Sequence, residues 1–198
     1  MRKPMSPIRI WARDRRLAAV HEAGHVVIAR MFSINADAYI RPVLGNVDVE
    51  CEKTWIGQTL YNRRDLRSRR KNAMFGVAGA VAALCWRGEF IDDESIWYAP
   101  EMMSESDWES TGCIPGEPDD NCLEAISAVA AVLERGASHW DDLVSEARNL
   151  IISSQPLLRA YRVSTHLHMT ERWVIEWLCS NPAEAAGEPL QRVLTNGM

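Results

Sequence analysis

The 198-residue sequence is short of paired cysteines, of long apolar runs and of positive charge. The cysteines are odd in number, and none belongs to a C-x-x-C pair: Cys51, Cys85, Cys113, Cys122 and Cys179. This usage argues against a disulfide framework and against a cysteine-based zinc site. The longest uncharged apolar run, residues 72–86, is shorter than the roughly 20 residues that cross a bilayer, so no membrane span is predicted.

The charge balance and the first residues bear on partners and location. A net charge of −5 argues against a general nucleic-acid coat protein, because such a protein would be strongly basic. The first residues are basic, but they lead into further arginines and not into an apolar stretch. No secretory signal is therefore recognised, and a cytoplasmic location is expected.

The composition is that of one globular domain. Apolar residues make up 47% of the chain, and eight tryptophans can supply a packed core. We expect a single domain over residues 1–180. Proline and glycine are frequent in residues 181–198, while large apolar side chains are few there, so this tail is expected to be loosely held.

Apolar spacing predicts a helix from residue 14 to about 32, followed by two short strands at 38–43 and 55–61. The strands would form a small antiparallel sheet. After the basic run 63–71, a second helix is expected, with one apolar stripe made of Met74, Val77, Ala78, Val81, Leu84 and Cys85. This helix should be buried on that stripe.

The second half of the chain begins with a segment that does not resemble a core element. Residues 88–118 are rich in glycine, proline and acidic residues, which is typical of a long excursion at the surface. A capping box of Ser138 and Asp141 is expected to open one of the later helices. The predicted helices of this half are 119–135, 138–152, 155–163 and 170–178.

The chemistry-bearing motif is H-E-A-G-H at residues 21–25, inside the first predicted helix. Two histidines at i and i+4 lie one turn apart on one helix face, so both imidazoles can bind one metal ion. Glu22 would act as the general base on a water molecule. The pattern could also arise by accident on a core helix, but two unpartnered imidazoles and a carboxylate would then be costly to bury. The motif therefore favours a zinc site.

Catalytic zinc sites usually have a third protein ligand, which the spacing of apolar residues does not identify. Three histidines are possible ligands, although alternate residues near a turn, such as His166 and His168, are usually solvated. The candidates are the acidic residues Asp92, Asp93, Glu94, Glu101, Glu105, Asp107 and Glu109, and the histidines His139, His166 and His168.

The segment 17–27, L-A-A-V-H-E-A-G-H-V-V, resembles the metal-binding helix of the peptidase domain of FtsH-type ATP-dependent zinc proteases. Residues 40–42 and 56–59 resemble that family's short strands, and residues 77–82 resemble its glycine-bearing helix. The resemblance covers roughly residues 14–178. It implies a zincin-like metallopeptidase domain and Zn²⁺ as the cofactor, with His21 and His25 as ligands and Glu22 as the catalytic base.

The resemblance also implies a third ligand. In the family this ligand is an aspartate in an S-x-x-D context before a hydrophobic residue, and Ser104-Glu105-Ser106-Asp107-Trp108 matches that context best. The alternative interpretation is a capping box, with Ser104 as N-cap and Asp107 three residues later. Asp107 is thus expected to be either a metal ligand or part of a helix cap.

Two features differ from the family pattern. The sequence contains no G-x-x-x-x-G-K-[ST] loop, so an ATPase that delivers substrates would have to be a separate protein. In the glycine-bearing helix, Ala78 and Ala80 replace the usual glycine and arginine, and Ala83 and Leu84 stand where acidic residues are usual.

The basic run 63–71 has no interleaved aromatic residues, so it is interpreted as a solvated helix start and not as a nucleic-acid site.

Together these observations predict a mostly helical α+β domain that acts as a zinc endopeptidase. The expected substrate is an unfolded or extended protein segment, laid along a strand edge near residues 54–61. One alternative is a regulatory peptidase with a single partner protein as its substrate. Another is a non-catalytic module that keeps zinc for stability and binds a partner protein. The oligomeric state does not follow from the sequence.

Overall fold

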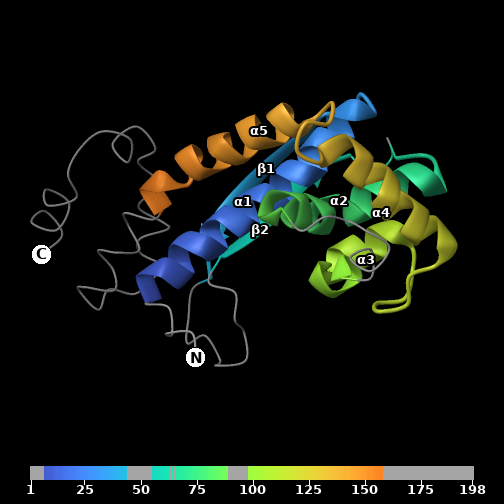
Figure 1. Cartoon of the computed structure of the whole chain (residues 1–198), viewed down its shortest axis with the longest axis horizontal. Helices are drawn as coiled ribbons and strands as arrows, with labels where there is room; N and C mark the ends of the chain where they lie inside the picture. Colours follow the sequence, from blue (N-terminus) through green and yellow to red (C-terminus); the bar gives the residue numbers. More distant parts are fainter. Residues whose placement is uncertain (1–6, 44–54, 63, 65, 89–97, 158–198) are drawn as a thin grey trace, which may run out of the picture.

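The computed structural model describes residues 7–43, 55–62, 64, 66–88 and 98–157 (Figure 1). These residues form a mixed α+β fold that is mostly helical and contains a two-stranded antiparallel sheet, as the sequence predicted. In chain order the elements are α1 (Pro7–Met31), β1 (Ala36–Pro42), β2 (Trp55–Tyr61), α2 (Arg69–Arg87), η3 (Pro100–Met102), α3 (Glu105–Thr111), α4 (Asp120–Leu133) and α5 (Trp140–Ser153).

Helix α2 lies at the centre of the fold and packs against α1, α3 and α4. Every residue from 73 to 85 is buried, so α2 is covered on all sides and not only along the predicted stripe. Its glycines and alanines allow this, because helices bearing small side chains can approach closely. At the crossing with α1, a Cβ on Gly24 would lie 2.5 Å from the carbonyl oxygen of Ala78. A glycine is therefore required where α1 crosses α2.

The hairpin of β1 and β2 packs against the N-terminal half of the fold. Both strands contact α1, and the register pairs Tyr39 with Gln58 at the middle of the sheet. Ile40 and Trp55 are buried on the inner face, while Tyr39 and Leu60 on the outer face are exposed. This alternation is the period-two pattern expected of a strand that is covered on one side. It places Gly57 and Thr59 toward α1.

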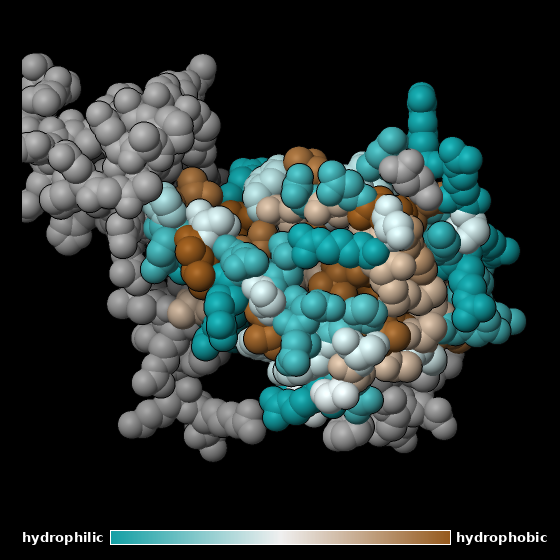
Figure 2. Space-filling view, turned by 90° about the horizontal axis from the view of Figure 1, so that it is seen from above, coloured by the Kyte–Doolittle hydropathy of each residue, from teal (hydrophilic) through white to brown (hydrophobic). Residues whose placement is uncertain are grey.

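Helix α5 lies alongside α1 (Figure 1) and is tied to it by polar contacts. The Arg15 guanidinium donates to the hydroxyl of Ser154 at 2.9 Å, and Arg30 pairs with Glu146 at 2.7 Å. Figure 2 looks onto the molecule from the α5 side, and hydrophilic side chains cover much of the described surface there. An amphipathic α5 explains this view, since its Leu143, Ala147 and Leu150 are buried against the core.

Some predicted helix boundaries were wrong. Helix α1 begins at Pro7, earlier than predicted, because the charged residues before the motif mask the apolar spacing without breaking the helix. Helix α5 begins at Trp140 with His139 as N-cap and no side-chain cap, so the predicted box at Ser138 does not form. The amide of His139 instead donates to the carbonyl oxygen of Val132 at 3.0 Å. Residue 139 therefore still belongs to the connection between α4 and α5.

The described part of the predicted excursion, residues 98–118, contains regular elements that its composition did not predict. These are η3 and α3, and Trp108 and Met103 belong to the hydrophobic core. Helix α3 opens with the predicted capping box of Ser104 and Asp107, and it ends at Gly112, whose φ of 76° is a left-handed conformation that suits glycine. With only seven residues, α3 is too short to show an apolar period in the sequence.

Several predictions fall wholly or partly outside the described residues. Residues 155–157 are helical, but the rest of the predicted helix 155–163, the helix 170–178 and the tail 181–198 lie beyond them. None of the helices in the described ranges has the length and apolarity that crossing a lipid bilayer requires. In the basic run, the described residues Arg64, Arg67 and Arg69 are exposed near the start of α2, and Arg69 pairs with Asp119.

Candidate metal centre

His21 and His25 lie one turn apart on α1, within the part of the helix that the rest of the fold covers. Their Nε2 atoms are 3.3 Å apart, and the ring planes are inclined by 70°. His25 is buried, while the His21 side chain keeps 19% of its surface exposed. The two Nε2 atoms thus face one another, and part of the His21 side chain is in contact with solvent.

Asp107, at the start of α3, completes the group. Its Oδ1 lies 3.1 Å from His25 Nε2, and its Oδ2 lies 3.3 Å from His21 Nε2. We call His21, His25 and Asp107 the triad. Their ligand atoms all lie within 4.8 Å of one another, and the triad could hold a metal ion.

The spacing of the triad atoms suits a small tetrahedral cation. An ion about 2.0–2.1 Å from two ligand atoms at a tetrahedral angle holds those atoms about 3.3 Å apart. The separations of 3.1 and 3.3 Å between imidazole nitrogens and carboxylate oxygens match that value. Two imidazoles and one carboxylate are also a donor set that zinc accepts. The residues present could therefore hold a metal ion of this kind.

Main-chain atoms and glycines of α2 hold the two imidazoles in place. His25 Nδ1 lies 2.8 Å from the carbonyl oxygen of Phe75, so Nδ1–H donates there and Nε2 is the nitrogen that faces Asp107. Fixing the tautomer in this way leaves Nε2 as the ligand atom. At Gly79 a Cβ would lie 2.4 Å from His21 Nε2. Gly79 therefore makes room for the His21 ring.

Asp107 is held by its own helix cap. The amide of Ser104 donates to Asp107 Oδ2 at 2.7 Å, and the Ser104 hydroxyl accepts from the Asp107 amide at 3.3 Å. The sequence left ligand and cap as alternatives, but in the structure the carboxylate takes part in the cap and faces both histidines. Gly76 of α2 permits the close approach of α3, because a Cβ there would lie 2.7 Å from the carbonyl oxygen of Asp107.

The triad perturbs its own ionisation. Burial acts to lower the pKa of His25, but the hydrogen bond and charge of Asp107, together with the charge of Glu22, raise it above the ordinary 6.5. Burial acts to raise the pKa of Asp107, whereas hydrogen bonds from His21 and His25 and their charges hold it well below its usual range. The site thus favours a positive charge between the carboxylate and the imidazoles.

Glu22 lies beside the triad and is only 6% exposed. The hydroxyl of Thr59, a residue of β2, donates to Glu22 Oε2 at 2.6 Å. At Gly57, two residues earlier in β2, a Cβ would lie 2.3 Å from Glu22 Cγ. Strand β2 therefore packs directly on the carboxylate that the sequence proposed as the base.

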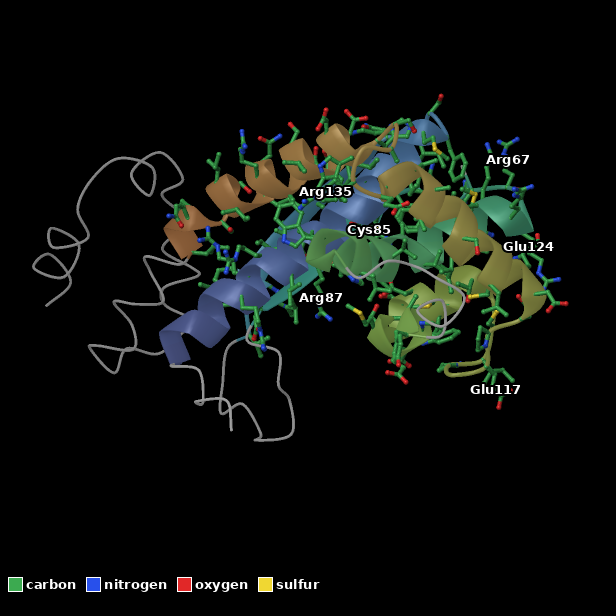
Figure 3. All side chains as sticks on the ribbon, viewed as in Figure 1. Arg67, Cys85, Arg87, Glu117, Glu124 and Arg135 are labelled. Carbon is green, nitrogen blue, oxygen red and sulfur yellow. The ribbon has the colours of Figure 1, made fainter. Side chains whose placement is uncertain are left out.

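A cleft of about 630 Å³ contains all four of these side chains. The whole of β2 lines it on one side, and residues of α3, including Ser106 and Ser110, line it on the other. Arg87, at the end of α2, also lines the cleft and is labelled in Figure 3. His21, His25, Glu22 and Asp107 thus line one cleft, with β2 along one side.

The other third-ligand candidates do not join the triad where they can be placed. Glu101 lines the cleft without belonging to the triad, and Glu105 and Glu109 are exposed. His139 pairs with Asp142 at 2.9 Å, at the start of α5. Asp92, Asp93, Glu94, His166 and His168 lie outside the described residues.

Sequence reasoning missed the residues that support the triad and Glu22. Phe75 acts through its main chain, so no side-chain pattern could have indicated it. Gly57, Thr59 and Gly79 stand in the predicted second strand and second helix, but the sequence assigned them no role. Their roles depend on contacts between segments that are far apart in the chain.

No protein-family model matches this chain, and no curated protein matches its sequence.

Proposed function

We propose that this chain is a zinc-dependent endopeptidase whose domain is zincin-like and similar to the peptidase domain of FtsH-type proteases. The observation that carries the proposal is the meeting of the triad with Glu22 in a cleft bordered by a strand. Two histidines and a carboxylate that could hold an ion, next to a second carboxylate that accepts a hydrogen bond from Thr59, are what metal-assisted hydrolysis requires.

Each residue has a distinct task in the proposed reaction. Zinc at the triad would lower the pKa of a water molecule toward about 7 and polarise the scissile carbonyl. His21, His25 and Asp107 would hold the ion. Glu22 would accept the proton of the attacking water and then pass it to the leaving amine, since a general base must return its proton for turnover.

The proposed substrate is an extended polypeptide segment. The cleft follows β2 along its length, and a strand can bind an extended chain through main-chain hydrogen bonds. A folded protein does not offer such a segment, so unfolded regions or flexible loops should be cut. Mapping the cleavage products by mass spectrometry tests this: cuts inside rigid, folded domains would contradict it.

Metal content is the first test. Elemental analysis of untagged protein should find one zinc per chain, and the His21→Ala and Asp107→Ala variants should lose it. A wild-type protein that binds no zinc would overturn the proposal. Zinc that persists in the Asp107→Ala variant would place the third ligand elsewhere.

Hydrolysis is the second test. The wild type should cut an unfolded protein substrate, and Glu22→Gln should keep its zinc but lose activity, because the amide cannot take a proton. A protein that is zinc-replete yet inactive on unfolded chains would instead support a zinc-stabilised interaction module. One dominant protein trapped by the Glu22→Gln variant would indicate a regulatory peptidase with a single substrate.

A further inference from the structure

Thr59 contacts Glu22 at two points, although the two residues are far apart in the sequence. The Thr59 hydroxyl oxygen lies 2.6 Å from Glu22 Oε2 and 3.5 Å from the main-chain oxygen of Glu22. A hydroxyl has one hydrogen to donate, and the shorter contact goes to the carboxylate. A hydrogen bond to a charged acceptor is stronger than one between neutral groups, so this contact fixes the orientation of the carboxylate.

The same face of β2 supplies both the donor and the space for Glu22. Gly57 and Thr59 are two residues apart and therefore lie on one face of the strand. A Cβ at Gly57 would lie 2.3 Å from Glu22 Cγ and 2.6 Å from Glu22 Oε1. The side chain of Glu22 thus fits between a residue that cannot carry a side chain and a residue whose hydroxyl binds Oε2.

We propose that Thr59 is the positioning residue for the general base: its hydroxyl holds Glu22 Oε2 and so leaves Oε1 as the oxygen that receives the proton of the attacking water. This inference rests on the proposed peptidase function. Thr59 is not a catalytic residue, because it acts through Glu22. A proton acceptor that is rotated or displaced loses its alignment with the water, and small misplacements of this kind lower turnover strongly.

The first experiment compares Thr59→Val with Thr59→Ser in the zinc-loaded protein. Valine keeps the shape of threonine without the hydroxyl, so kcat should fall about tenfold or more, with KM and zinc content unchanged. Serine keeps the hydroxyl and should retain kcat to within about threefold of the wild type. A Thr59→Val variant with wild-type kcat, or a Thr59→Ser variant as impaired as Thr59→Val, would overturn the inference.

A matched control separates positioning from a general loss of stability. Ser154 is a buried hydroxyl that bonds Arg15, and neither residue is among the described residues that line the cleft. Ser154→Ala should lower the urea midpoint of unfolding and leave kcat unchanged. If Ser154→Ala lowers kcat as much as Thr59→Val does, the effect of Thr59 is structural and the inference fails.

The second experiment does not depend on activity. In zinc-free protein, Thr59→Val should lower the urea midpoint when Glu22 is present and should have little effect in a Glu22→Ala background, because the lost bond is already absent there. Equal shifts in both backgrounds would overturn the inference. If the wild type cuts nothing, the proposed peptidase function fails, while this double-mutant cycle still decides whether Thr59 holds Glu22.

Discussion

At the residue scale, the triad depends on atoms that are not ligands. The Phe75 carbonyl sets which nitrogen of His25 faces Asp107, and Gly79 leaves the space that the ring of His21 occupies. Residues that orient metal ligands commonly change metal affinity about 10- to 100-fold when they are altered. Substitutions next to the triad should therefore affect metal binding more than they affect folding.

Gly79→Ala tests this statement. A Cβ at Gly79 would lie 2.4 Å from His21 Nε2, and a histidine ring can swing away at little cost to the fold. Zinc affinity should fall about 10- to 100-fold while thermal stability stays close to that of the wild type. Competition with a chromogenic chelator measures the affinity.

Gly24→Ala is the contrasting variant. Its Cβ would meet the main-chain oxygen of Ala78 at 2.5 Å, and a helix backbone cannot move aside as a side chain does. This variant should lower the melting temperature of the zinc-free protein. Equal effects of Gly24→Ala and Gly79→Ala on stability, with zinc affinity intact in both, would contradict the role given to Gly79.

The ionisation of the triad predicts a pH dependence. The pKa of His25 is raised, so the pair of His25 and Asp107 stabilises the zinc-free protein fully below about pH 6.5, the pKa of an unfolded histidine. This stability is lost as the pH rises through the higher folded-state pKa. The pKa of Asp107 is lowered, so its contribution is present above about pH 3.9 and is lost on acidification below that.

Urea unfolding across pH 5–9 checks this prediction. With a chelator present, stability should decline as the pH rises above about 6.5. With zinc present it should not, because the cation replaces the proton between His25 and Asp107 and binds best when His25 is neutral. A chelated protein whose stability rises steadily toward pH 9 would show that the pair does not act in this way.

At the element scale, α3 is the element that the sequence described least well. The flanking proline, glycine and acidic residues indicated a loop, and seven residues give too few turns for a period. Helix α1 and the hairpin were predicted because their periods run over enough residues. Asp107 was selected through the S-x-x-D resemblance, and only the packing of α3 on α2 shows that its carboxylate reaches both histidines.

The two roles of Asp107 can be separated with two variants. Asp107→Asn keeps an oxygen that accepts the Ser104 amide, so the cap should remain, but the charged ligand is lost and zinc should not be retained. Ser104→Ala removes the hydroxyl that accepts from the Asp107 amide and leaves the bond from the Ser104 amide to the carboxylate. It should reduce the free energy of unfolding by about 1 kcal/mol with zinc still bound. Elemental analysis measures the zinc content of both variants, and urea unfolding measures their stability. Loss of zinc in Ser104→Ala alone would contradict this assignment.

At the scale of the whole molecule, α2 is the common support. It contacts α1, α3 and α4, and it supplies the carbonyl of Phe75 and the space at Gly79 and Gly76. The sequence predicted one apolar stripe, because periodicity cannot show that several partners cover a helix on every side. The support of the triad could not be predicted for the same reason: it arises where segments far apart in the chain meet.

Cys85, in the buried part of α2, and Cys122, near the start of α4, carry buried thiols of low reactivity. Burial, helped by the charge of Glu134, raises the pKa of Cys85 to about 11, and burial raises that of Cys122 to about 12. Cys85 lies among the helices in Figure 3. At pH 8, iodoacetamide should modify Cys113, which is partly exposed, well before Cys85 and Cys122. Mass spectrometry of native protein measures this order, and early labelling of Cys85 would contradict it.

The distance along the chain between the triad members has a consequence for synthesis. A growing polypeptide carries both imidazoles long before it carries the carboxylate of Asp107, and that carboxylate is positioned only after α3 docks on α2. Whatever ion the triad takes, the complete set of three ligands exists only after residue 107 has been made and α3 has docked. Until then the growing chain carries two of the three ligands, so it cannot hold the ion as the finished triad would.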